Sequence, residues 1–112
     1  MDEVCEVVVT APDRGWLSDF ALRLVDDRLC ACGQIVAPVR SVYRWGTRVE
    51  EESEARVALH ARSEFVPLIL ERVGAEHTYD VPCVLVLPVA GGNPAYLDWV
   101  RAETAPAAAH PS

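Results

Sequence analysis

The chain has 112 residues, a mass of 12.3 kDa and a formal net charge of −7, from 17 acidic and 10 basic residues. This length suits one domain. The acidic balance argues against sequence-independent nucleic-acid binding and against docking on an anionic membrane, because both need a basic surface. All the basic residues are arginine, so Schiff-base chemistry on a lysine is excluded. The hydrophobic fraction of 51% is typical of a small domain that buries apolar residues against another subunit.

The N-terminus and the cysteines predict a cytoplasmic protein. Met1, Asp2 and Glu3 are acidic or neutral where a secretory signal would be basic. The longest apolar run, 81–90, is shorter than the roughly 20 residues that a membrane-spanning helix needs. We expect reduced, buried thiols and no disulfide framework for the four cysteines, which are Cys5, Cys30, Cys32 and Cys83.

The first third of the chain predicts a strand followed by a helix. Residues 4–10 contain three consecutive valines, which is typical of a strand buried on both faces. Apolar residues then recur at helical spacing from Trp16 to Val25, which predicts a helix over about 15–29. Asp13 is placed to cap this helix.

The middle of the chain predicts a long β-hairpin. Residues 32–45 are rich in strand-forming side chains, and Pro38 indicates an edge strand or a bulge. A turn at 46–48 leads to a return strand over 49–61, in which Val57 and Leu59 share one face. A strand of this length spans about 43 Å at about 3.3 Å per residue, so part of the hairpin should extend beyond its own domain.

The last third predicts a helix, a strand and a short helix. Ser63 is placed to cap the first of these helices and Gly74 to end it. Its core face would be formed by Phe65, Leu68, Ile69 and Val73. Residues 81–89 predict a strand, and Asn93 followed by Pro94 is a strong start for the final helix.

The order of the elements predicts an α+β fold, a ferredoxin-like βαββαβ sandwich with an extra C-terminal helix. We expect a single domain over 1–104 and a disordered C-terminal tail over 105–112. The helices cover one face of the sheet, so the other face and the long hairpin must be covered by something else. Another subunit is the most economical cover.

A series of short motifs resembles the CutA family of divalent-cation tolerance proteins over about residues 7–101. The motifs are Thr10-Ala11-Pro12-Asp13, the segment 29–32, Ser41-Val42-Tyr43-Arg44-Trp45, Glu50-Glu51-Glu52-Ser53-Glu54, His77-Thr78-Tyr79-Asp80-Val81-Pro82, Leu87-Pro88-Val89 and Asn93-Pro94-Ala95-Tyr96-Leu97-Asp98-Trp99. The resemblance implies a homotrimer of ferredoxin-like subunits whose long hairpins pair between subunits. It also implies binding of copper or another divalent cation in some members.

The same resemblance indicates where metal ligands would lie. Family members have a Cys at the end of the first strand, a His at the start of the loop before the last core strand, and a Glu after the proline of that loop. Here these positions hold Val9, Glu76 or His77, and Cys83. His77 and Cys83 are candidate ligands because imidazole and thiolate both bind copper and zinc. The alternative is that His77 bonds the loop backbone and Cys83 is buried in the strand.

The acidic run at 50–54 and the histidine at position 60 each have two interpretations. Glu50, Glu52 and Glu54 share one face of a strand and could hold a hard cation, or they could be solvated and pair with arginines 44 and 48. His60 stands where the family usually has Lys, and it is either a solvated strand residue or a pH sensor near an interface.

Aromatic residues near the hairpin end and in the last helix are candidates for an inter-subunit surface. They could line a small-ligand cleft between subunits, or they could anchor the interface by packing. The candidate cleft and interface residues are Tyr43, Trp45, Glu50, Glu54, Tyr79, Tyr96 and Trp99.

The sequence predicts a cytoplasmic, non-enzymatic homotrimer implicated in tolerance of or response to divalent metal ions such as copper. It has no nucleophile elbow, no Walker A motif and no H-E-x-x-H motif. Apolar surroundings would also suppress a dyad of Cys83 and His77. The alternative hypothesis is a PII-like trimeric signalling or adaptor module with a small ligand between subunits, although the chain has neither a glycine-rich phosphate loop nor a lysine cluster. No nucleic-acid or membrane partner is expected.

Overall fold

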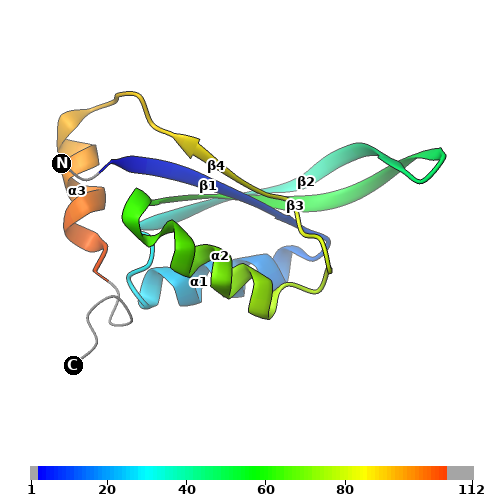
Figure 1. The fold of residues 1–112 in the computed structure, drawn as a ribbon, viewed down its shortest axis with the longest axis horizontal. Helices are drawn as coiled ribbons and strands as arrows, with labels where there is room; N and C mark the ends of the chain where they lie inside the picture. Colours follow the sequence, from blue (N-terminus) through cyan, green and yellow to red (C-terminus); the bar gives the residue numbers. More distant parts are fainter. Residues whose placement is uncertain (1–2, 106–112) are drawn as a thin grey trace.

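The computed structural model describes residues 3–105. Its elements are β1 (Val4–Ala11), α1 (Arg14–Asp26), β2 (Cys32–Trp45), β3 (Arg48–Arg62), a 3-10 turn (Ser63–Phe65), α2 (Val66–Glu76), β4 (Val84–Pro88) and α3 (Pro94–Glu103). The strands form one antiparallel sheet in the order β2-β3-β1-β4, with α1 and α2 together on one face (Figure 1). The predicted ferredoxin-like α+β sandwich with a C-terminal helix is confirmed.

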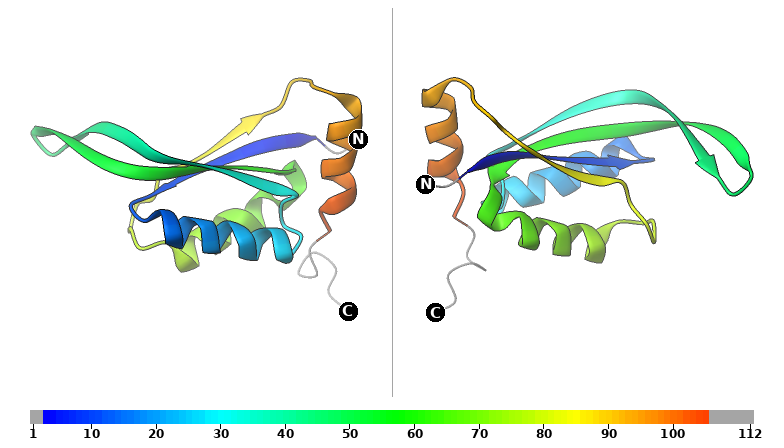
Figure 2. Two further views of the ribbon diagram at one scale, coloured as in Figure 1. Left: turned by 180° about the vertical axis from the view of Figure 1, so that it is seen from behind. Right: turned by 45° about the horizontal axis from the view of Figure 1, so that its top comes forward.

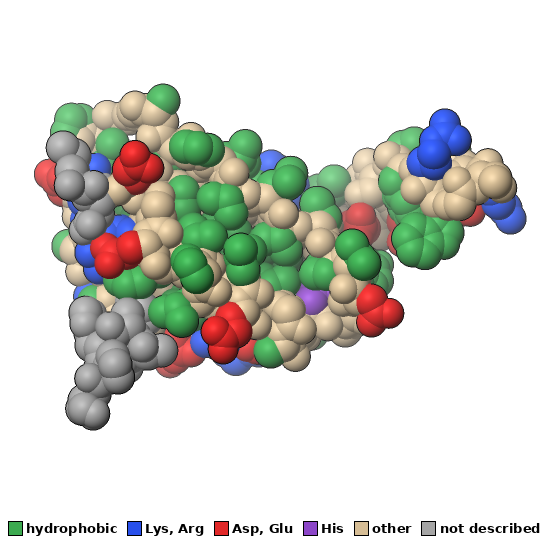
Figure 3. Space-filling model, in the orientation of Figure 1, with side chains coloured by type: hydrophobic (Ala, Val, Ile, Leu, Met, Phe, Trp, Pro, Cys, Tyr) green, Lys and Arg blue, Asp and Glu red, His purple; other side chains and the backbone are tan. Residues whose placement is uncertain are grey.

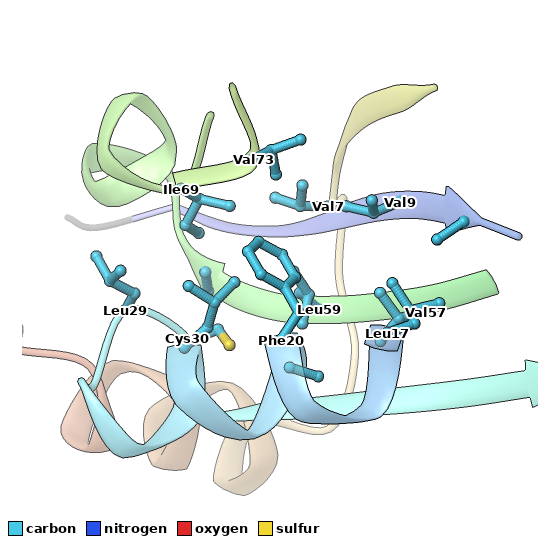
Figure 4. Packing of buried hydrophobic residues seen from close by; sticks show 14 of the residues in the cluster. Val7, Val9, Leu17, Phe20, Leu29, Cys30, Val57, Leu59, Ile69 and Val73 are labelled. Carbon is cyan, nitrogen blue, oxygen red and sulfur yellow. The ribbon is translucent and has the colours of Figure 1, made fainter. Parts of the chain in front are cut away.

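The hydrophobic core lies between the sheet and helices α1 and α2. Alternate residues of β1 and β3 point toward the helices, and Figure 4 shows Phe20 of α1 reaching across to them and toward Ile69 of α2. The fully buried strand residues on this helix-covered face include Val7, Val9, Val57 and Leu59. Asp13 caps α1 as predicted, because its carboxylate accepts the N–H of Gly15 at 2.9 Å.

The hairpin of β2 and β3 extends past the end of the sheet. Strand β3 pairs with β1 only from Ala55 to Arg62, whereas its pairing with β2 continues to Trp45 opposite Arg48. Residues 39–54 therefore pair only with each other, and we call them the hairpin arm (Figure 2). A bulge between Val36 and Val39 begins the arm, as Pro38 predicted. The expected extension of the hairpin beyond its own domain is confirmed.

The face of the sheet opposite α1 and α2 is covered only at one end, and we call it the open face. Helix α3 packs there in a small cluster that includes Val4, Ala31 and Val100. Farther along this face Val36, Leu85 and Leu87 are exposed, although they are large apolar side chains. Part of the apolar side-chain surface is therefore exposed, and Figure 3 shows hydrophobic side chains gathered in patches on one side of the molecule.

Helix α2 begins later and ends later than the sequence predicts. Ser63 opens a 3-10 turn instead of capping the helix, and Pro67 lies in the first turn of α2, where its missing N–H costs nothing. Gly74 lies inside the helix rather than ending it. Glu76 holds the last turn because its carboxylate accepts from Arg72 at 2.6 Å and from Arg23 of α1 at 2.7 Å.

Two further boundaries differ from the predictions. Helix α1 ends at Asp26 because Arg28 adopts a φ of +61°, and its guanidinium donates to the carbonyls of Ala102 and Glu103 at the end of α3. Strand β4 begins only at Val84, since Pro82 has no N–H for the ladder and Val81 is 85% exposed. The predicted disorder of the tail over 105–112 falls outside the described residues except for Ala105, whose N–H donates to the Arg28 carbonyl at 3.1 Å.

Two glycines give opposite expectations for the same substitution. A Cβ at Gly33 would lie 3.1 Å from Leu59 and 3.3 Å from Ala21 and Val57, so this glycine lets α1 approach the sheet. At Gly74 no atom lies within 4 Å of the added Cβ. We expect Gly33→Ala to lower the free energy of unfolding by about 1–3 kcal/mol through overpacking. Gly74→Ala should raise it by about 0.5–1 kcal/mol through helix propensity.

Denaturant unfolding measures both changes in the free energy of unfolding. All variants are compared at one protein concentration, so that any contribution of subunit association to the stability is the same. Equal shifts of the same sign in the two variants would contradict the packing role assigned to Gly33.

Candidate functional site

The loop at 77–83 holds both candidate metal ligands and is fixed to the end of β1. The Nε2 atom of His77 lies 2.8 Å from the carbonyl oxygen of Thr10, and the N–H of Thr10 donates to the carbonyl of Cys83 at 3.3 Å. The N–H of Tyr79 donates to Nδ1 of His77 at 3.0 Å. A carbonyl only accepts and an amide N–H only donates, so His77 is a neutral imidazole with its proton on Nε2.

This arrangement decides what His77 can do chemically. Both of its ring nitrogens already have backbone partners, and its ring also packs edge-on against Trp16 with centroids 5.2 Å apart. A metal ion needs a free nitrogen lone pair, so coordination requires the loss of one of these hydrogen bonds. The geometry matches the alternative that the sequence left open, in which His77 bonds the loop backbone.

Cys83 differs from its expected environment. It precedes β4 and is exposed, so the expectation of a buried strand thiol is wrong. An exposed thiol is available to a soft cation or to another subunit. Within residues 3–105 the structure contains no group of three or more His, Cys, Asp or Glu side chains arranged to hold a metal ion.

On the hairpin arm, most carboxylates of the acidic run at 50–54 have a side-chain partner. Arg48 pairs with Glu50 at 3.5 Å, Arg40 pairs with Glu51, and the hydroxyl of Tyr43 donates to Glu52 at 2.7 Å. The pair of Arg40 with Glu51 was not predicted from the sequence. Glu50 and Glu52 have separate partners, which fits the interpretation of a solvated strand better than that of a shared cation site.

The candidate interface residues fall into two groups at opposite ends of the molecule. Tyr43, Trp45 and Glu50 lie on the arm, Glu54 lies at its base, and Tyr79 lies close enough for the charges of Glu54 and Glu52 to raise its pKa, after burial as the larger cause. Tyr96 and Trp99 lie on α3, with ring centroids 5.7 Å apart. Trp45 is 71% exposed and Trp99 is 42% exposed, so each group presents an unburied tryptophan.

The α3 end holds a polar network that the sequence analysis did not predict. Glu6 of β1, Cys32 of β2 and His60 of β3 lie in one row across the open face, because Glu6 and Cys32 are both register partners of His60. His60 Nε2 lies 2.9 Å from Glu6 Oε2, and Tyr96 Oη lies 2.5 Å from His60 Nδ1 and 3.1 Å from Cys32 Sγ.

We call these four residues the Cys32 network. The side chain of His60 is only 14% exposed, so the expectation of a solvated strand residue is wrong. Their separation in the sequence hides the network, and only the strand order β2-β3-β1 brings them together. The one available signal is the charge of Glu6 within β1, a strand that is otherwise largely apolar.

Hollows on the single chain are small and open. One, of about 210 Å³, lies at the base of the arm and includes Glu54, Pro38 and Arg14 in its lining. This is below the roughly 300 Å³ at which small-molecule sites usually begin. Another, of about 410 Å³, lies between α1 and β2 and is lined mostly by apolar side chains. No helix within residues 3–105 is long and apolar enough to cross a membrane.

A four-stranded ferredoxin-like sheet with a projecting hairpin and a C-terminal helix on its open face defines a distinct class of small α+β proteins. Residues 5–103 match the family described as CutA1 divalent ion tolerance protein. The chain is 40% identical over 104 residues to the divalent-cation tolerance protein CutA of Thermus thermophilus, covering 93% of this chain and 99% of that one. The chain belongs to the CutA1 family.

Two further relatives support this assignment. The chloroplastic protein CutA of Arabidopsis thaliana is 38% identical over 98 residues, which cover 88% of this chain but 54% of that protein. The chain therefore spans about half the length of the plant relative. The crystal structure of CutA1 from Oryza sativa has a TM-score of 0.88 at 34% identity and covers 92% of this chain and 94% of its own. Nothing in these relatives supports the alternative of a PII-like module.

The contact between Tyr43 and Glu52 gives a prediction about proton binding. The hydrogen bond to Glu52 raises the pKa of Tyr43 to about 12, with smaller effects of desolvation and of the nearby negative charges. We expect Glu52→Gln to lower the pKa of Tyr43 toward its ordinary value of about 10, because the amide carries no charge. Ultraviolet absorbance of tyrosinate, followed from pH 8 to pH 12.5, measures this shift.

The linked effect on stability has a definite sign. The raised pKa favours the neutral hydroxyl in the folded state, so its contribution to stability is full below about pH 10 and is lost as the pH rises through about 12. Thr47→Gln, at the tip of the arm, is the matched control and should leave the titration unchanged. An unchanged titration in Glu52→Gln would show that the carboxylate does not set this pKa.

Proposed function

We propose that this protein acts in tolerance of divalent metal ions as a non-enzymatic cytoplasmic homotrimer that binds copper or another divalent cation weakly. One observation carries the proposal: the match to the CutA1 family covers residues 5–103 and includes the complete hairpin arm. The relative from Thermus thermophilus carries tolerance of divalent cations in its name. The cytoplasmic location is proposed from the four cysteines, which are all free thiols within residues 3–105.

Assembly is supported by surfaces that a single chain leaves without cover. The arm exposes Val42, Trp45 and Val49 at 59%, 71% and 63%, and no core of its own lies beneath them. The open face exposes Leu85 and Leu87. Apolar surface of this kind on a small domain marks a protein interface. Both outer strands of the sheet, β2 and β4, also present unpaired edges.

The positions of these surfaces favour a ring. The arm and the α3 end lie at opposite ends of a molecule whose longest extent is 46 Å (Figures 1 and 2). A contact between two different patches is heterologous, and such contacts close into a cyclic oligomer when the rotation between subunits permits. Three subunits would carry a net charge of three times −7, or −21. A net negative charge attracts cations from solution without forming a specific site.

Metal binding is proposed at the 77–83 loop, through the exposed thiol of Cys83 and the imidazole of His77. His77 must first release either the Tyr79 N–H or the Thr10 carbonyl. The net contribution of such a hydrogen bond is about 1 kcal/mol, which lowers the affinity about fivefold. Two ligands from one chain and this additional cost limit the affinity to the micromolar range at best.

The trimer is tested by the mass of the particle in solution. We expect light scattering after size exclusion to give about 37 kDa, three times 12.3 kDa. Trp45 is exposed in the single chain and is proposed to be buried at the subunit interface. Trp45→Glu should lower this mass because it would bury a charge in that interface. Thr47→Glu adds the same charge in the turn at the end of the arm and should leave the mass unchanged. A wild-type mass of 12.3 kDa at micromolar concentration would refute the trimer.

The metal proposal is tested by calorimetric titration of the reduced protein with zinc, since zinc does not oxidise thiols. We expect a dissociation constant in the micromolar range or weaker, and at least a fivefold further loss in Cys83→Ser and in His77→Gln. Cys32→Ser removes a thiol at the other end of the sheet and is the matched control. Identical isotherms for wild type, Cys83→Ser and His77→Gln would overturn the assignment of the site.

A further inference from the structure

We propose that Arg56, on the open face, forms an ion pair with Glu52 on the hairpin arm of a second copy of this chain. The pair decides which face of the arm docks and where on the open face the arm lies. This inference rests on the assembly proposed above and names a contact that the assembly makes. It does not depend on metal binding.

Arg56 is a cation without a partner in the middle of the open face. In the sheet register it pairs with Thr10 on one side and with Val36 on the other. Its side chain points away from the core, because the next residue, Val57, faces the helices and is fully buried. The side chains of Arg56 and Val36 are both exposed. Within residues 3–105 no hydrogen bond or ion pair holds the Arg56 guanidinium.

The other charged side chains that β1 and the paired half of β3 place on the open face already have partners. Glu6 lies 2.9 Å from His60, and Arg62 lies 3.2 Å from Glu64. When another subunit covers this face, Arg56 therefore has no counter-charge beside it. A guanidinium buried without a counter-charge destabilises a contact, so the covering surface has to supply a carboxylate at this position.

The arm carries a suitable carboxylate on the same face as its exposed tryptophan. Register pairing places Tyr43, Trp45 and Glu52 on one face of the arm. Arg48 and Glu50, also on this face, neutralise each other at 3.5 Å. The partner of Glu52 is the uncharged hydroxyl of Tyr43 at 2.7 Å, so Glu52 keeps its negative charge. A carboxylate has about four lone-pair sites and can accept from a guanidinium and a hydroxyl together.

This pair can form only between two chains. Glu52 and Arg56 are four residues apart along the extended strand β3, which separates them by about 13 Å. The nearer carboxylate of the same strand is Glu54, but in the part of the chain that the structure describes no ion pair joins it to Arg56. In a closed ring each subunit gives one arm and receives one, so every Arg56 meets a Glu52.

The spacing of groups on the arm matches the spacing on the open face. Glu52 and Trp45 lie about 13 Å apart, because Ser41, the register partner of Glu52, precedes Trp45 by four residues. On the open face Arg56 and Leu85 lie about 12 Å apart, at a separation of two strands and two residues. When Glu52 meets Arg56, the indole of Trp45 can therefore cover Leu85, which is 58% exposed. One docked arm thus neutralises a charge and buries apolar surface.

A zero-length cross-link tests the pair, because the chain contains no lysine. Arg56→Lys keeps the positive charge and places the one side-chain amine of the protein at this position. We expect a water-soluble carbodiimide, at micromolar protein concentration and near-neutral pH, to join this amine to Glu52 of another subunit. A denaturing gel should then show covalent dimers and trimers, and peptide mass spectrometry should locate the bond at Glu52.

Arg14→Lys is the matched control, because it places the amine on α1, on the other side of the sheet, and should give no covalent dimers. A bond from position 56 to Glu54 of the same chain would overturn the proposal. So would the absence of any bond in a variant that light scattering shows to be trimeric. A monomeric wild type would refute the assembly and the ion pair together, which distinguishes the two failures.

Charge reversal gives a second, independent test. We expect Arg56→Glu and Glu52→Arg each to raise the protein concentration at which half of the trimer dissociates by at least about thirtyfold, because like charges then meet at the contact. Combining the two substitutions in one chain restores opposite charges to every contact and should recover most of this loss. Arg56→Glu combined with Glu54→Arg is the matched control and should not recover it. Recovery in this control alone would place the pair within one chain and overturn the proposal.

Discussion

The rest of this structure depends on the unequal pairing of strand β3. Its C-terminal half is bonded on both sides, to β1 and to β2, and there its inward side chains Val57 and Leu59 are fully buried. Its N-terminal half has only β2 as a partner and no helix beneath it. Because one strand continues from the core into solvent, the same element both stabilises the domain and carries the arm away from it.

The features that the sequence predicts well are those decided by neighbouring residues. The alternation around Val57, the cap at Asp13, the bulge near Pro38 and the length of the hairpin each depend on local spacing, and all are present. Gly74 shows the limit of such rules. A glycine ends a helix only where the chain needs a positive φ, and here the bonds of Glu76 to Arg72 and Arg23 hold the final turn in helical form.

The candidate site was harder to predict because it depends on which strands are neighbours. His60 gives no sign in the sequence that Glu6 and Cys32 flank it, since the partners are 54 and 28 residues away. For Cys83 the prediction erred in the opposite direction, because the sequence indicated a buried thiol and the structure has an exposed one. Its apolar surroundings in the sequence favoured burial, but the backbone leaves the sheet before Val84 and carries the thiol to the surface. Tertiary pairing, and not propensity, decided both positions.

The two described histidines show how the identity of the partner determines chemistry. The ring of His77 is hydrogen-bonded to a backbone amide and a backbone carbonyl, and neither group takes up or releases a proton. These bonds hold the loop against β1. His60 is bonded by a carboxylate, a phenol and a thiol, each of which can change its charge. Every nitrogen of the two rings has a hydrogen-bond partner, but only the partners of His60 are ionisable side chains. The hydrogen bonds of His60 therefore join ionisable side chains from β1, β2 and α3, whereas those of His77 hold the loop to β1.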